Sequence, residues 1–415
     1  MYISSRKGFT LIELLVVLAI IAILAVVVVL TLNPAELLRQ ARDSNRVSDM
    51  STLTSALGEY NTDQSGASSF NMGSPNVVYV SIPDPTATST AGDQCQGLGL
   101  ISLPSTYTYH CSETSTYRNV NGTGWIPINF QNMSTGSPLG SLPVDPTNTS
   151  STRLYYTYTT NGTQYEVTAV MESAKYQLGG SNDVISGDGG PLASVYEKGS
   201  KLGLEPLDYG DATLVGYWPF NEGAGTVAYD DSGNGNNGTL TSGPTWVSGK
   251  VQSNALSFGS SAYVAPGAIP NLGTGDHPNS VSMWIYLTAY PTSNLAAFSY
   301  SAESGCAHGH IMLYIYIPGY WGYATCANDF ASSLYIPLNQ WVFIAASYSG
   351  SKQVMVVMNS QSQLGTLSSP LNLGSFSSAS LPVPGSGITT IENDVRVWNR
   401  ALSAAQLTAM YSGGK

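Results

Sequence analysis

At its start the chain reads Arg6-Lys7-Gly8-Phe9-Thr10-Leu11-Ile12-Glu13, and an apolar run then continues to Leu32. Between Phe9 and Leu32 the only ionisable side chain is that of Glu13. About 20 apolar residues are enough for one helix to cross a bilayer. Two basic residues precede the run, and basic residues tend to stay on the cytoplasmic side. The sequence therefore predicts a membrane span after which the rest of the chain is exported.

The segment from Arg6 to Leu14 resembles the class III leader of type IV pilins and type II secretion pseudopilins. The resemblance implies a leader over 1–8, cleavage between Gly8 and Phe9 by a prepilin peptidase, and methylation of the new Phe9 amine. It also implies assembly into a helical filament with other pilin-like subunits. In an ordinary secretory signal peptide the cleavage site follows the apolar region, whereas here the processing signal precedes it.

Glu13 is the residue to which we assign filament assembly. A carboxylate at the centre of a bilayer costs about 3 kcal/mol and is usually functional. After cleavage, the positive amine of Phe9 would lie one helical turn away, so Glu13 can neutralise it in its own chain or in a neighbour. Pairing with a neighbour would fix the stagger between subunits. The alternative is a carboxylate that reaches the membrane interface and has no partner.

The apolar run ends at Leu32-Asn33-Pro34, where proline removes a backbone donor. From Ala35 to Tyr60 apolar residues recur at helical spacing, with charged residues between them. The sequence therefore predicts a transmembrane and filament-core helix over 9–60, bent near Pro34. Its second half is expected to pack under a globular head.

Composition limits the partners and the cellular compartment. The 415 residues carry a net charge of −11, which disfavours direct binding of nucleic acid. The four cysteines fall into two local pairs, Cys95 with Cys111 and Cys306 with Cys326. In an exported chain such pairs indicate disulfides, each worth about 3 kcal/mol in the chain-entropy model. Unpaired buried thiols or a metal site are the alternatives.

Residues 61–178 contain the clearest hairpin signal of the chain. Asn161-Gly162 separates the β-prone runs 153–158 and 164–170, and Asn-Gly between such runs is a strong hairpin signal. Leu142-Pro143-Val144-Asp145-Pro146 precedes this Tyr-rich hairpin, and that order resembles pseudopilin heads. The resemblance implies a small antiparallel sheet laid against the second half of the helix.

Residues 179–210 are interpreted as a linker, because the segment is rich in glycine and has weak periodicity. Major pseudopilins can carry a calcium loop after the last strand. Asp183 and Asp188 could supply oxygen ligands to such a loop, so this alternative stays open.

Residues 211–415 contain many short alternating runs separated by Gly, Ser and Pro, which predicts an all-β sandwich. Ser403 is expected to cap a short helix that continues to Tyr411. The opening Trp218-Pro219-Phe220-Asn221-Glu222-Gly223 and the closing Asp394-Val395-Arg396-Val397-Trp398-Asn399-Arg400 resemble the LamG-like, concanavalin A-like jellyroll family. The resemblance implies a domain that binds glycans or proteins and that often holds calcium.

No cofactor is required by this reading, but a structural calcium ion is an open alternative. Calcium takes six to eight oxygen ligands, and the first and last strands of a jellyroll can lie together. The candidate ligands are Glu222, Asp231, Asn234 and Asp394. The alternative is that these side chains only shape turns.

Two further groups are candidates for binding. Sugar recognition needs exposed aromatic faces beside amides and hydroxyls, and Tyr320, Trp321 and Tyr323 fit this composition. They could equally be core aromatics. His308 and His310 could form a two-ligand metal pair, or be solvated loop histidines.

Catalysis is not expected. Glucanases of the concanavalin A-like fold place two carboxylates at alternate positions of one strand. Glu392 and Asp394 alternate, but they lie in the exit motif of the non-catalytic members. The sequence contains no Gly-x-Ser-x-Gly, His-Glu-x-x-His or P-loop motif.

The sequence thus predicts a multidomain chain: a long helix with a small antiparallel-sheet pilin head, then a β-sandwich jellyroll. The predicted function is a pilin-like or pseudopilin subunit, made as a single-pass protein of the bacterial cytoplasmic membrane. After assembly it would lie in a cell-surface or periplasmic filament and display the jellyroll for adhesion or secretion. An extra domain of about 200 residues favours a minor subunit. The alternatives are a membrane-anchored glycan-processing enzyme and a DNA-uptake pseudopilin.

Overall fold

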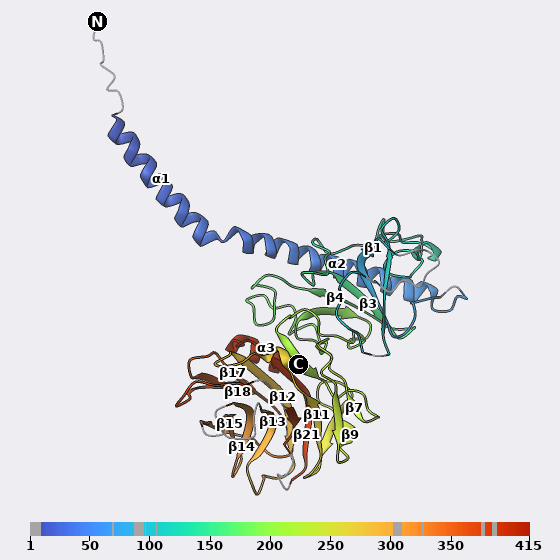
Figure 1. Cartoon of the computed structure of the whole chain (residues 1–415). Helices are drawn as coiled ribbons and strands as arrows, with labels where there is room; N and C mark the ends of the chain where they lie inside the picture. Colours follow the sequence, from blue (N-terminus) through green and yellow to red (C-terminus); the bar gives the residue numbers. More distant parts are fainter. Residues whose placement is uncertain are drawn as a thin grey trace.

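The computed structural model describes residues 10–68, 70–86, 95, 97–104, 106–301, 309–325, 328–374, 378–383 and 388–415. A helix projects from a folded body that contains a five-stranded sheet backed by a second helix and a two-sheet sandwich (Figure 1). The sheet and the sandwich lie against each other, and the projecting helix reaches away from both.

The two N-terminal helices are α1 (Leu11–Leu32) and α2 (Pro34–Gln64). Asn33 lies between them in the left-handed region at φ 40°, and its side chain accepts a hydrogen bond from the backbone N–H of Glu36. Proline is well suited to the first position of α2. A backbone N–H there would have no partner inside the helix, so proline, which lacks an N–H, loses no hydrogen bond. This break lies where the sequence predicts the bend. Among the described residues, no helix reaches the length and apolar content needed to cross a membrane.

The five-stranded sheet has the order β2-β1-β3-β4-β5. Its strands are β1 (Val77–Asp84), β2 (Thr108–Glu113), β3 (Tyr156–Thr160), β4 (Tyr165–Val170) and β5 (Val195–Gly199). The β1–β2 pair is parallel, so the sheet is mixed and not purely antiparallel as expected. The β3–β4 hairpin forms around Asn161-Gly162, as the turn signal predicts.

The buried face of α2 packs on this sheet through five apolar side chains, those of Met50, Leu53, Ala56, Leu57 and Tyr60. A one-turn helix, η1 (Phe130–Asn132), adds Phe130 to the same core. The spacing of these α2 residues is the helical one, so one face of α2 is covered.

Strand β5 lies inside the segment 179–210, which the sequence suggests is a linker. It pairs with β4 at five positions, from Val170 opposite Val195 to Glu166 opposite Gly199. Residues 205–209 that follow are buried as well. Weak periodicity hides this strand, because it is short and carries a buried glutamate. The segment is therefore part of the folded body and does not act as a free connection.

The sandwich confirms the predicted all-β domain. One eight-stranded sheet has the order β19-β18-β17-β12-β21-β10-β9, with β6 paired to β21. Its strands are β6 (Leu214–Trp218), β9 (Thr245–Ser248), β10 (Asn254–Phe258), β12 (Asn279–Leu287), β17 (Trp341–Tyr348), β18 (Gln353–Met358), β19 (Gln361–Thr366) and β21 (Thr390–Trp398).

The second sheet of the sandwich has the order β16-β15-β14-β13-β20-β11-β8-β7. Its strands are β7 (Val227–Ala228), β8 (Gly238–Thr241), β11 (Tyr263–Gly267), β13 (Leu295–Ser301), β14 (His310–Tyr316), β15 (Tyr320–Ala324), β16 (Phe330–Tyr335) and β20 (Ser378–Leu381). A one-turn helix, η2 (Pro270–Leu272), follows β11. Ser403 caps α3 (Ala404–Gly413) through a capping box with Gln406, as the sequence predicts.

The five-stranded sheet and the sandwich share one hydrophobic core. Val80 and Val195 of the sheet belong to the same buried cluster as Trp284, Phe343 and Leu407 of the sandwich and α3. A contact between two domains joined by a free linker would be smaller and more polar. The two parts are therefore packed as one body.

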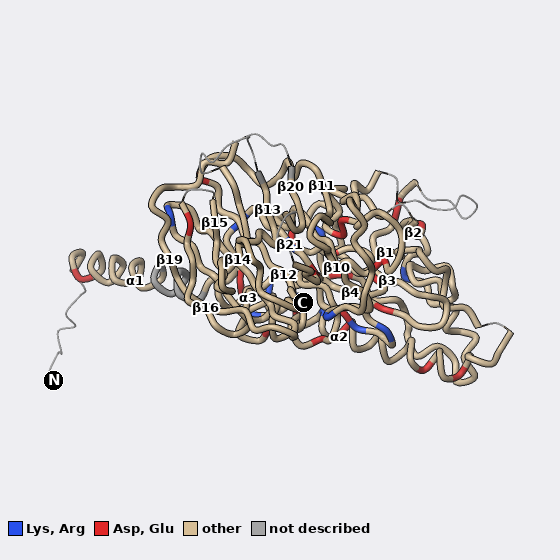
Figure 2. The backbone as a smooth tube through the Cα atoms, turned by 90° about the horizontal axis from the view of Figure 1, so that it is seen from below, with Lys and Arg blue, Asp and Glu red and all other residues tan. Residues whose placement is uncertain are grey.

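Charged residues are sparse on this body. Figure 2 shows Lys and Arg scattered over the described backbone and not gathered into one stripe. A protein that tracks phosphates concentrates its basic residues on one face. The described residues of this body show no such concentration of basic residues.

Candidate functional site

The first candidate site is the start of α1. Thr10 caps the helix, and the Oε2 atom of Glu13 accepts hydrogen bonds from the backbone N–H and the hydroxyl of Thr10, both at 2.8 Å. The N–H of Glu13 donates in return to the Thr10 hydroxyl. The capping box therefore turns the carboxylate of Glu13 toward the N-terminal end of the helix. Gly8 and Phe9 lie outside the described residues, so the pairing of Glu13 with the Phe9 amine stays a prediction.

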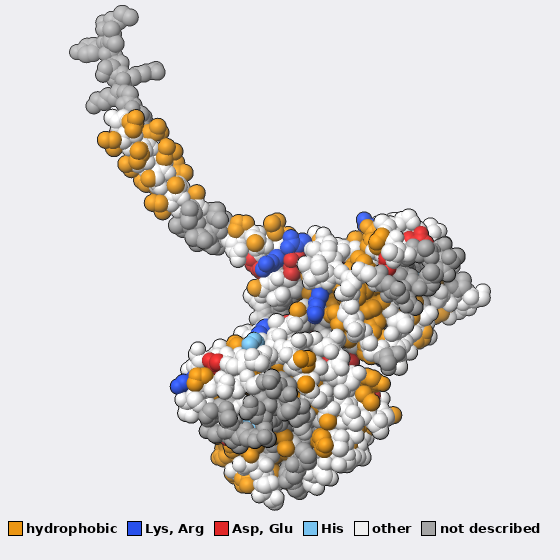
Figure 3. Space-filling view, in the orientation of Figure 1, with side chains coloured by type: hydrophobic (Ala, Val, Ile, Leu, Met, Phe, Trp, Pro, Cys, Tyr) orange, Lys and Arg blue, Asp and Glu red, His pale blue; other side chains and the backbone are white. Residues whose placement is uncertain are grey.

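The surface of α1 beyond the cap is apolar. Leu11 and Ile12 are 79% and 75% exposed, and exposed aliphatic side chains continue to Leu24. Figure 3 shows these side chains around the part of α1 that is drawn in colour. An exposed apolar surface of this extent marks a contact with a membrane or with other chains.

A buried ionic cluster fixes α2 to the sheet. Arg46 is fully buried, and its guanidinium makes two hydrogen bonds to Asp145, of 2.6 and 2.9 Å. It also donates to Asp43 at 2.7 Å and to Glu172 at 2.8 Å. Helical spacing places these charged residues on other faces than the apolar ones and does not show that Arg46 and Asp43 are buried. A signal does exist, since Asp145 is the only charged residue of the motif Leu142–Pro146.

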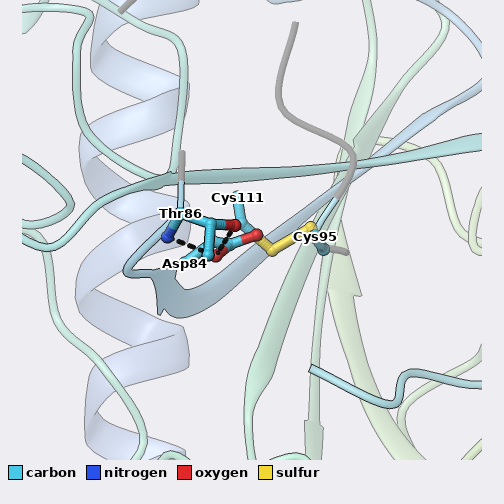
Figure 4. The surroundings of a disulfide bond; sticks show 4 residues. All are labelled: Asp84, Thr86, Cys95 and Cys111. Atoms are coloured by element: carbon cyan, nitrogen blue, oxygen red, sulfur yellow. Dashed lines mark hydrogen bonds between the residues drawn. A yellow bond between two sulfur atoms is a disulfide. The ribbon is translucent and has the colours of Figure 1, made fainter. Parts of the chain in front are cut away.

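The predicted disulfide between Cys95 and Cys111 is present. Figure 4 shows it beside Asp84, whose carboxylate accepts hydrogen bonds from the N–H and the hydroxyl of Thr86. Both cysteines are buried, and the bond ties the segment before β2 to the edge of the sheet. Cys306 and Cys326 lie outside the described residues, and so does His308.

Two of the four calcium candidates, Asp394 and Asn234, bind groups on the first and last strands of the sandwich. Asp394 accepts a hydrogen bond from the hydroxyl of Tyr217 at 2.9 Å and forms an ion pair with Arg396 at 3.0 Å. Burial raises the pKa of Asp394 to about 6, and the positive charge of Arg396 opposes this rise. The amide of Asn234 donates to the carbonyl of Leu214. These two side chains are used to hold the first and last strands of the sandwich.

The other two candidates, Glu222 and Asp231, line a cavity of about 200 Å³ with Glu205, between the sheet and the sandwich. Glu222 accepts a hydrogen bond from the N–H of Tyr229 through Oε1, while its buried Oε2 has no partner within the described part of the chain. Burial, and then the charge of Glu222, raises the pKa of Asp231 well above its ordinary value. The described residues contain no group of three or more His, Cys, Asp or Glu that could hold a metal ion.

Asp183 and Asp188, the candidate ligands of a second calcium site, already bind other groups of the protein. Asp183 accepts hydrogen bonds from the N–H groups of Gly179, Ile185 and Ser186. Asp188 binds the ammonium of Lys415 at 2.9 Å. The positive charge beside Asp188 is therefore supplied by the side chain of Lys415.

The three aromatic candidates separate into two groups. Tyr320 is 41% exposed, but Trp321 and Tyr323 are fully buried in the sandwich core, so their assignment as ligand-binding residues is wrong. Trp321 and Tyr323 lie two apart on β15, and such residues point to the same face of a strand. Two further aromatic residues, which the sequence does not single out, are exposed or partly exposed here: Tyr335 lies beside Tyr320, and Tyr290 lies beside Tyr335. His310, the described member of the histidine pair, lies on β14 and is partly exposed.

The alternate carboxylates of β21 do not form an accessible pair. Glu392 is fully buried, and its strand neighbours Leu256 and Ile285 belong to the apolar core of the sandwich. Burial raises the pKa of Glu392 well above its ordinary value. Asp394 is 1% exposed. A substrate therefore does not reach either carboxyl group.

Two family models match the chain. Residues 3–29 match the prokaryotic N-terminal methylation motif, and residues 258–408 match the concanavalin A-like lectin/glucanases superfamily. No curated protein matches the chain.

Several solved structures resemble it at low identity. Domain 4 of AbnA, a GH43 extracellular arabinanase from Geobacillus stearothermophilus in complex with arabinotriose, has a TM-score of 0.39 and 18% identity over 48% of this chain and 98% of that domain. The binding domain of Paraclostridial Mosquitocidal Protein 1 gives a TM-score of 0.41 at 14% identity, over 48% of this chain and 52% of that one. Trypanosoma rangeli sialidase gives 0.37 at 13% identity over 48% of this chain, and the match spans only 32% of the sialidase.

The methylation motif implies processing by a prepilin peptidase and assembly with other pilin subunits. It also implies a membrane-anchored precursor and then a surface or periplasmic filament. The chain joins a prepilin-type N-terminal methylation motif to a C-terminal domain of the concanavalin A-like lectin/glucanases superfamily.

Proposed function

We propose that the chain is a minor subunit of a pilin-like or pseudopilin filament and that it displays a domain which binds carbohydrate or protein. The observation that carries the proposal is α1, an apolar helix that projects from the folded body and lies mostly within the matched methylation motif. A filament core made of such helices would bury the apolar surface that a single chain leaves exposed.

The bulk of the body supports the assignment as a minor subunit. A sandwich of two eight-stranded sheets is packed on the five-stranded sheet, and one of its sheets contributes to the shared core. Such a body cannot swing aside as a domain on a free linker could. Repeating it at every position of a tightly packed shaft would require room for the whole sandwich at each step.

The buried positions of Glu392 and Asp394 support a binding domain over the glycan-processing enzyme. A glycosidase needs two carboxyl groups that flank the bond to be cut. The test is to incubate the full chain with each glycan that it binds and to measure new reducing ends. Turnover would overturn the binding-only assignment.

Processing and assembly are tested by expressing the full chain with a prepilin peptidase and with the pilins of the same machine. We expect a mature chain that begins at methylated Phe9, seen by mass spectrometry. Glu13→Ala should still be cleaved but should enter sheared filaments far less than the parent chain. Glu59→Ala is the matched control, since Glu59 is an exposed carboxylate on α2. Normal incorporation of Glu13→Ala would contradict the role of Glu13 in assembly.

Calcium stays a prediction, now confined to Glu222 and Asp231. What supports it is the cavity that both line and the buried Oε2 atom of Glu222 that has no described partner. Asn234 and Asp394 are not proposed as ligands, because the amide of Asn234 binds the carbonyl of Leu214 and the charge of Asp394 is already paired with Arg396.

A further inference from the structure

Three tyrosine rings lie together at the end of the second sheet formed by β15 and β16. We call Tyr290, Tyr320 and Tyr335 the tyrosine ridge. The ring of Tyr335 lies 5.0 Å from that of Tyr290 and 5.0 Å from that of Tyr320. Tyr320 and Tyr335 are directly opposite each other on neighbouring strands, so both side chains leave the same face. That face is the outer one, because Trp321 next to Tyr320 points into the core.

The exposed apolar side chains of the body gather at this place. Among the described residues beyond the two N-terminal helices, the exposed large hydrophobic side chains are Ile317, Tyr320, Tyr335 and Leu364. The first three belong to the ridge or to the turn beside it. Exposed aromatic residues of this kind cost solubility unless they serve a contact, so their concentration at one site indicates binding.

The ridge is held in place before any ligand arrives. The hydroxyl of Tyr335 donates to the carbonyl of Pro318 at 2.9 Å, and the hydroxyl of Tyr290 donates to the carbonyl of Ile336 at 3.0 Å. Gly319 has φ +144°, and a Cβ there would lie 2.6 Å from the ring of Tyr290. Only glycine lets the turn approach the rings this closely. A preorganised aromatic surface loses little conformational entropy on binding.

Polar groups lie beside the aromatic rings. Ser333 is exposed and precedes Tyr335 by two residues, so it shares the same face of β16. Its N–H and hydroxyl both donate to Oε1 of Gln363. The amide NH₂ of Gln363 has no partner within the described part of the chain and is free to donate to a ligand. Rings next to a hydroxyl and an amide suit a sugar, which has an apolar face and equatorial hydroxyls.

Charge and size select the class of ligand. The ridge, Ile317, Ser333 and Gln363 carry no charge, and the chain has a net charge of −11. An acidic glycan would be repelled by the chain and would find no cation at the ridge. A stable protein interface buries about 800 Å² on each partner, which is far more than three tyrosines and one isoleucine provide.

The ring planes further restrict the ligand. Tyr335 is inclined by 60° to Tyr290 and by 80° to Tyr320. Rings at such angles cannot all lie flat on the face of a crystalline fibre. They can contact successive sugars of one chain that turns along its length.

We propose that the tyrosine ridge is a binding subsite for a neutral, single-chain polysaccharide. The proposal rests on the proposed function, because it assigns a ligand class to the displayed domain. β14 and β15 lie on the part of the sandwich away from the five-stranded sheet (Figures 1 and 2), so the ridge does not compete with the shared core. The ligand would contact Tyr320 and Tyr335 through its apolar faces and Gln363 through a hydroxyl.

The test uses the detergent-solubilised full chain in affinity electrophoresis. The neutral soluble probes are mixed-linkage β-glucan, galactomannan and arabinan, the acidic probe is alginate, and the flat surface is microcrystalline cellulose. We expect retardation by at least one neutral soluble probe and by neither alginate nor cellulose. Tyr320→Ala and Tyr335→Ala should each weaken that binding about fivefold to tenfold. Tyr320→Phe keeps the ring and should bind as the parent does.

Leu364→Ala is the matched control, since Leu364 is exposed and its side chain leaves β19 on the face opposite to that of Gln363. Thermal unfolding checks that each tyrosine variant is folded. Absence of binding to the neutral soluble probes, equal binding by the alanine variants, or preference for alginate or cellulose would each overturn the ridge proposal. Equal binding by folded alanine variants would leave the proposed function intact. A chain that binds through the ridge but never enters filaments would instead overturn the proposed function and leave the ridge.

Discussion

We call the contact between α2 and the five-stranded sheet the helix joint, and the contact between that sheet and the sandwich the sandwich joint. The two joints are built differently, although each contains a fully buried arginine. At the joint between α2 and the five-stranded sheet, carboxylates of Asp43, Asp145 and Glu172 surround the guanidinium of Arg46. At the joint between the sheet and the sandwich, Arg396 stacks on the ring of Tyr217 at 4.1 Å. Its Nε and Nη1 atoms have no hydrogen-bond partner within the described part of the chain.

The difference shows what holds each joint. The helix joint relies on directional ion pairs, so loss of one partner leaves buried charges uncompensated. The sandwich joint also contains buried ion pairs, Arg396 with Asp394 and Lys415 with Asp188, but it adds to them a shared apolar core in which side chains of the sandwich and α3 pack with residues of the sheet. Apolar contact has no preferred direction, so this joint depends on filled volume more than on any one polar contact.

Arg46→Met tests the helix joint and should give the largest effect. Removing Arg46 leaves the buried carboxylates of Asp43 and Asp145 without their cation, which should lower the free energy of unfolding by about 3–5 kcal/mol. Urea denaturation followed by circular dichroism measures the loss. Arg39→Met is the matched control, because Arg39 is 52% exposed and its ion pair is long at 3.7 Å. A loss below that of Arg396→Met would reverse the comparison.

Leu407→Ala tests the sandwich joint. Leu407 is fully buried in the shared core, so the variant leaves a cavity and should lose about 2–4 kcal/mol. Denaturation should remain a single transition if sheet and sandwich unfold together. Leu364→Ala serves as the control, since that leucine is 77% exposed. Two separate transitions in the parent chain would show that the core is not shared in solution.

The dependence of stability on pH sharpens the comparison and should be the smallest effect. Burial raises the pKa of Glu205, which lies at the sandwich joint, to about 8. The folded chain therefore holds a proton that the unfolded chain releases near the ordinary pKa of 4.5. This contribution is complete below pH 4.5 and is lost as the pH rises through 8, so stability should fall by about 2–3 kcal/mol between pH 5 and 8.

Glu205→Gln should make this profile less steep, while Glu59→Gln should leave it unchanged. The hydroxyl of Thr157 donates to Glu205 at 2.6 Å, and the charge of Glu166 adds to the rise in pKa. Asp394, with its pKa raised to about 6 by burial, acts in the same direction between pH 4 and 6. A parent profile that rises from pH 5 to 8 would contradict the assignment.

Local signals in the sequence predict local structure well. Asn161-Gly162 predicts the β3–β4 hairpin, and Ser403 predicts the start of α3, because each works through hydrogen bonds within a few residues. Alternation of apolar and polar residues along the chain likewise predicts β12, β17 and β18. These elements need no distant partner to reveal them.

Features that depend on distant partners are missed. Val195–Gly199 becomes a strand only because β4 lies beside it, and Arg46 is buried only because Asp145 reaches it from 99 residues away. Trp321 and Tyr323 have the composition of a sugar site, but the direction in which β15 faces decides their burial. The sequence identifies Tyr320, whereas Tyr335 joins it through strand pairing.

The buried connection between β5 and β6 has a mechanical consequence. The chain crosses from the sheet to the sandwich through the residues between Gly199 and Leu214, and residues 205–209 of that crossing are buried. Tension applied between the far end of the sandwich and α1 therefore loads the shared core before it can stretch the connecting chain. The body should therefore transmit force rigidly. Under sufficient force the five-stranded sheet should separate from the sandwich before the connecting chain extends.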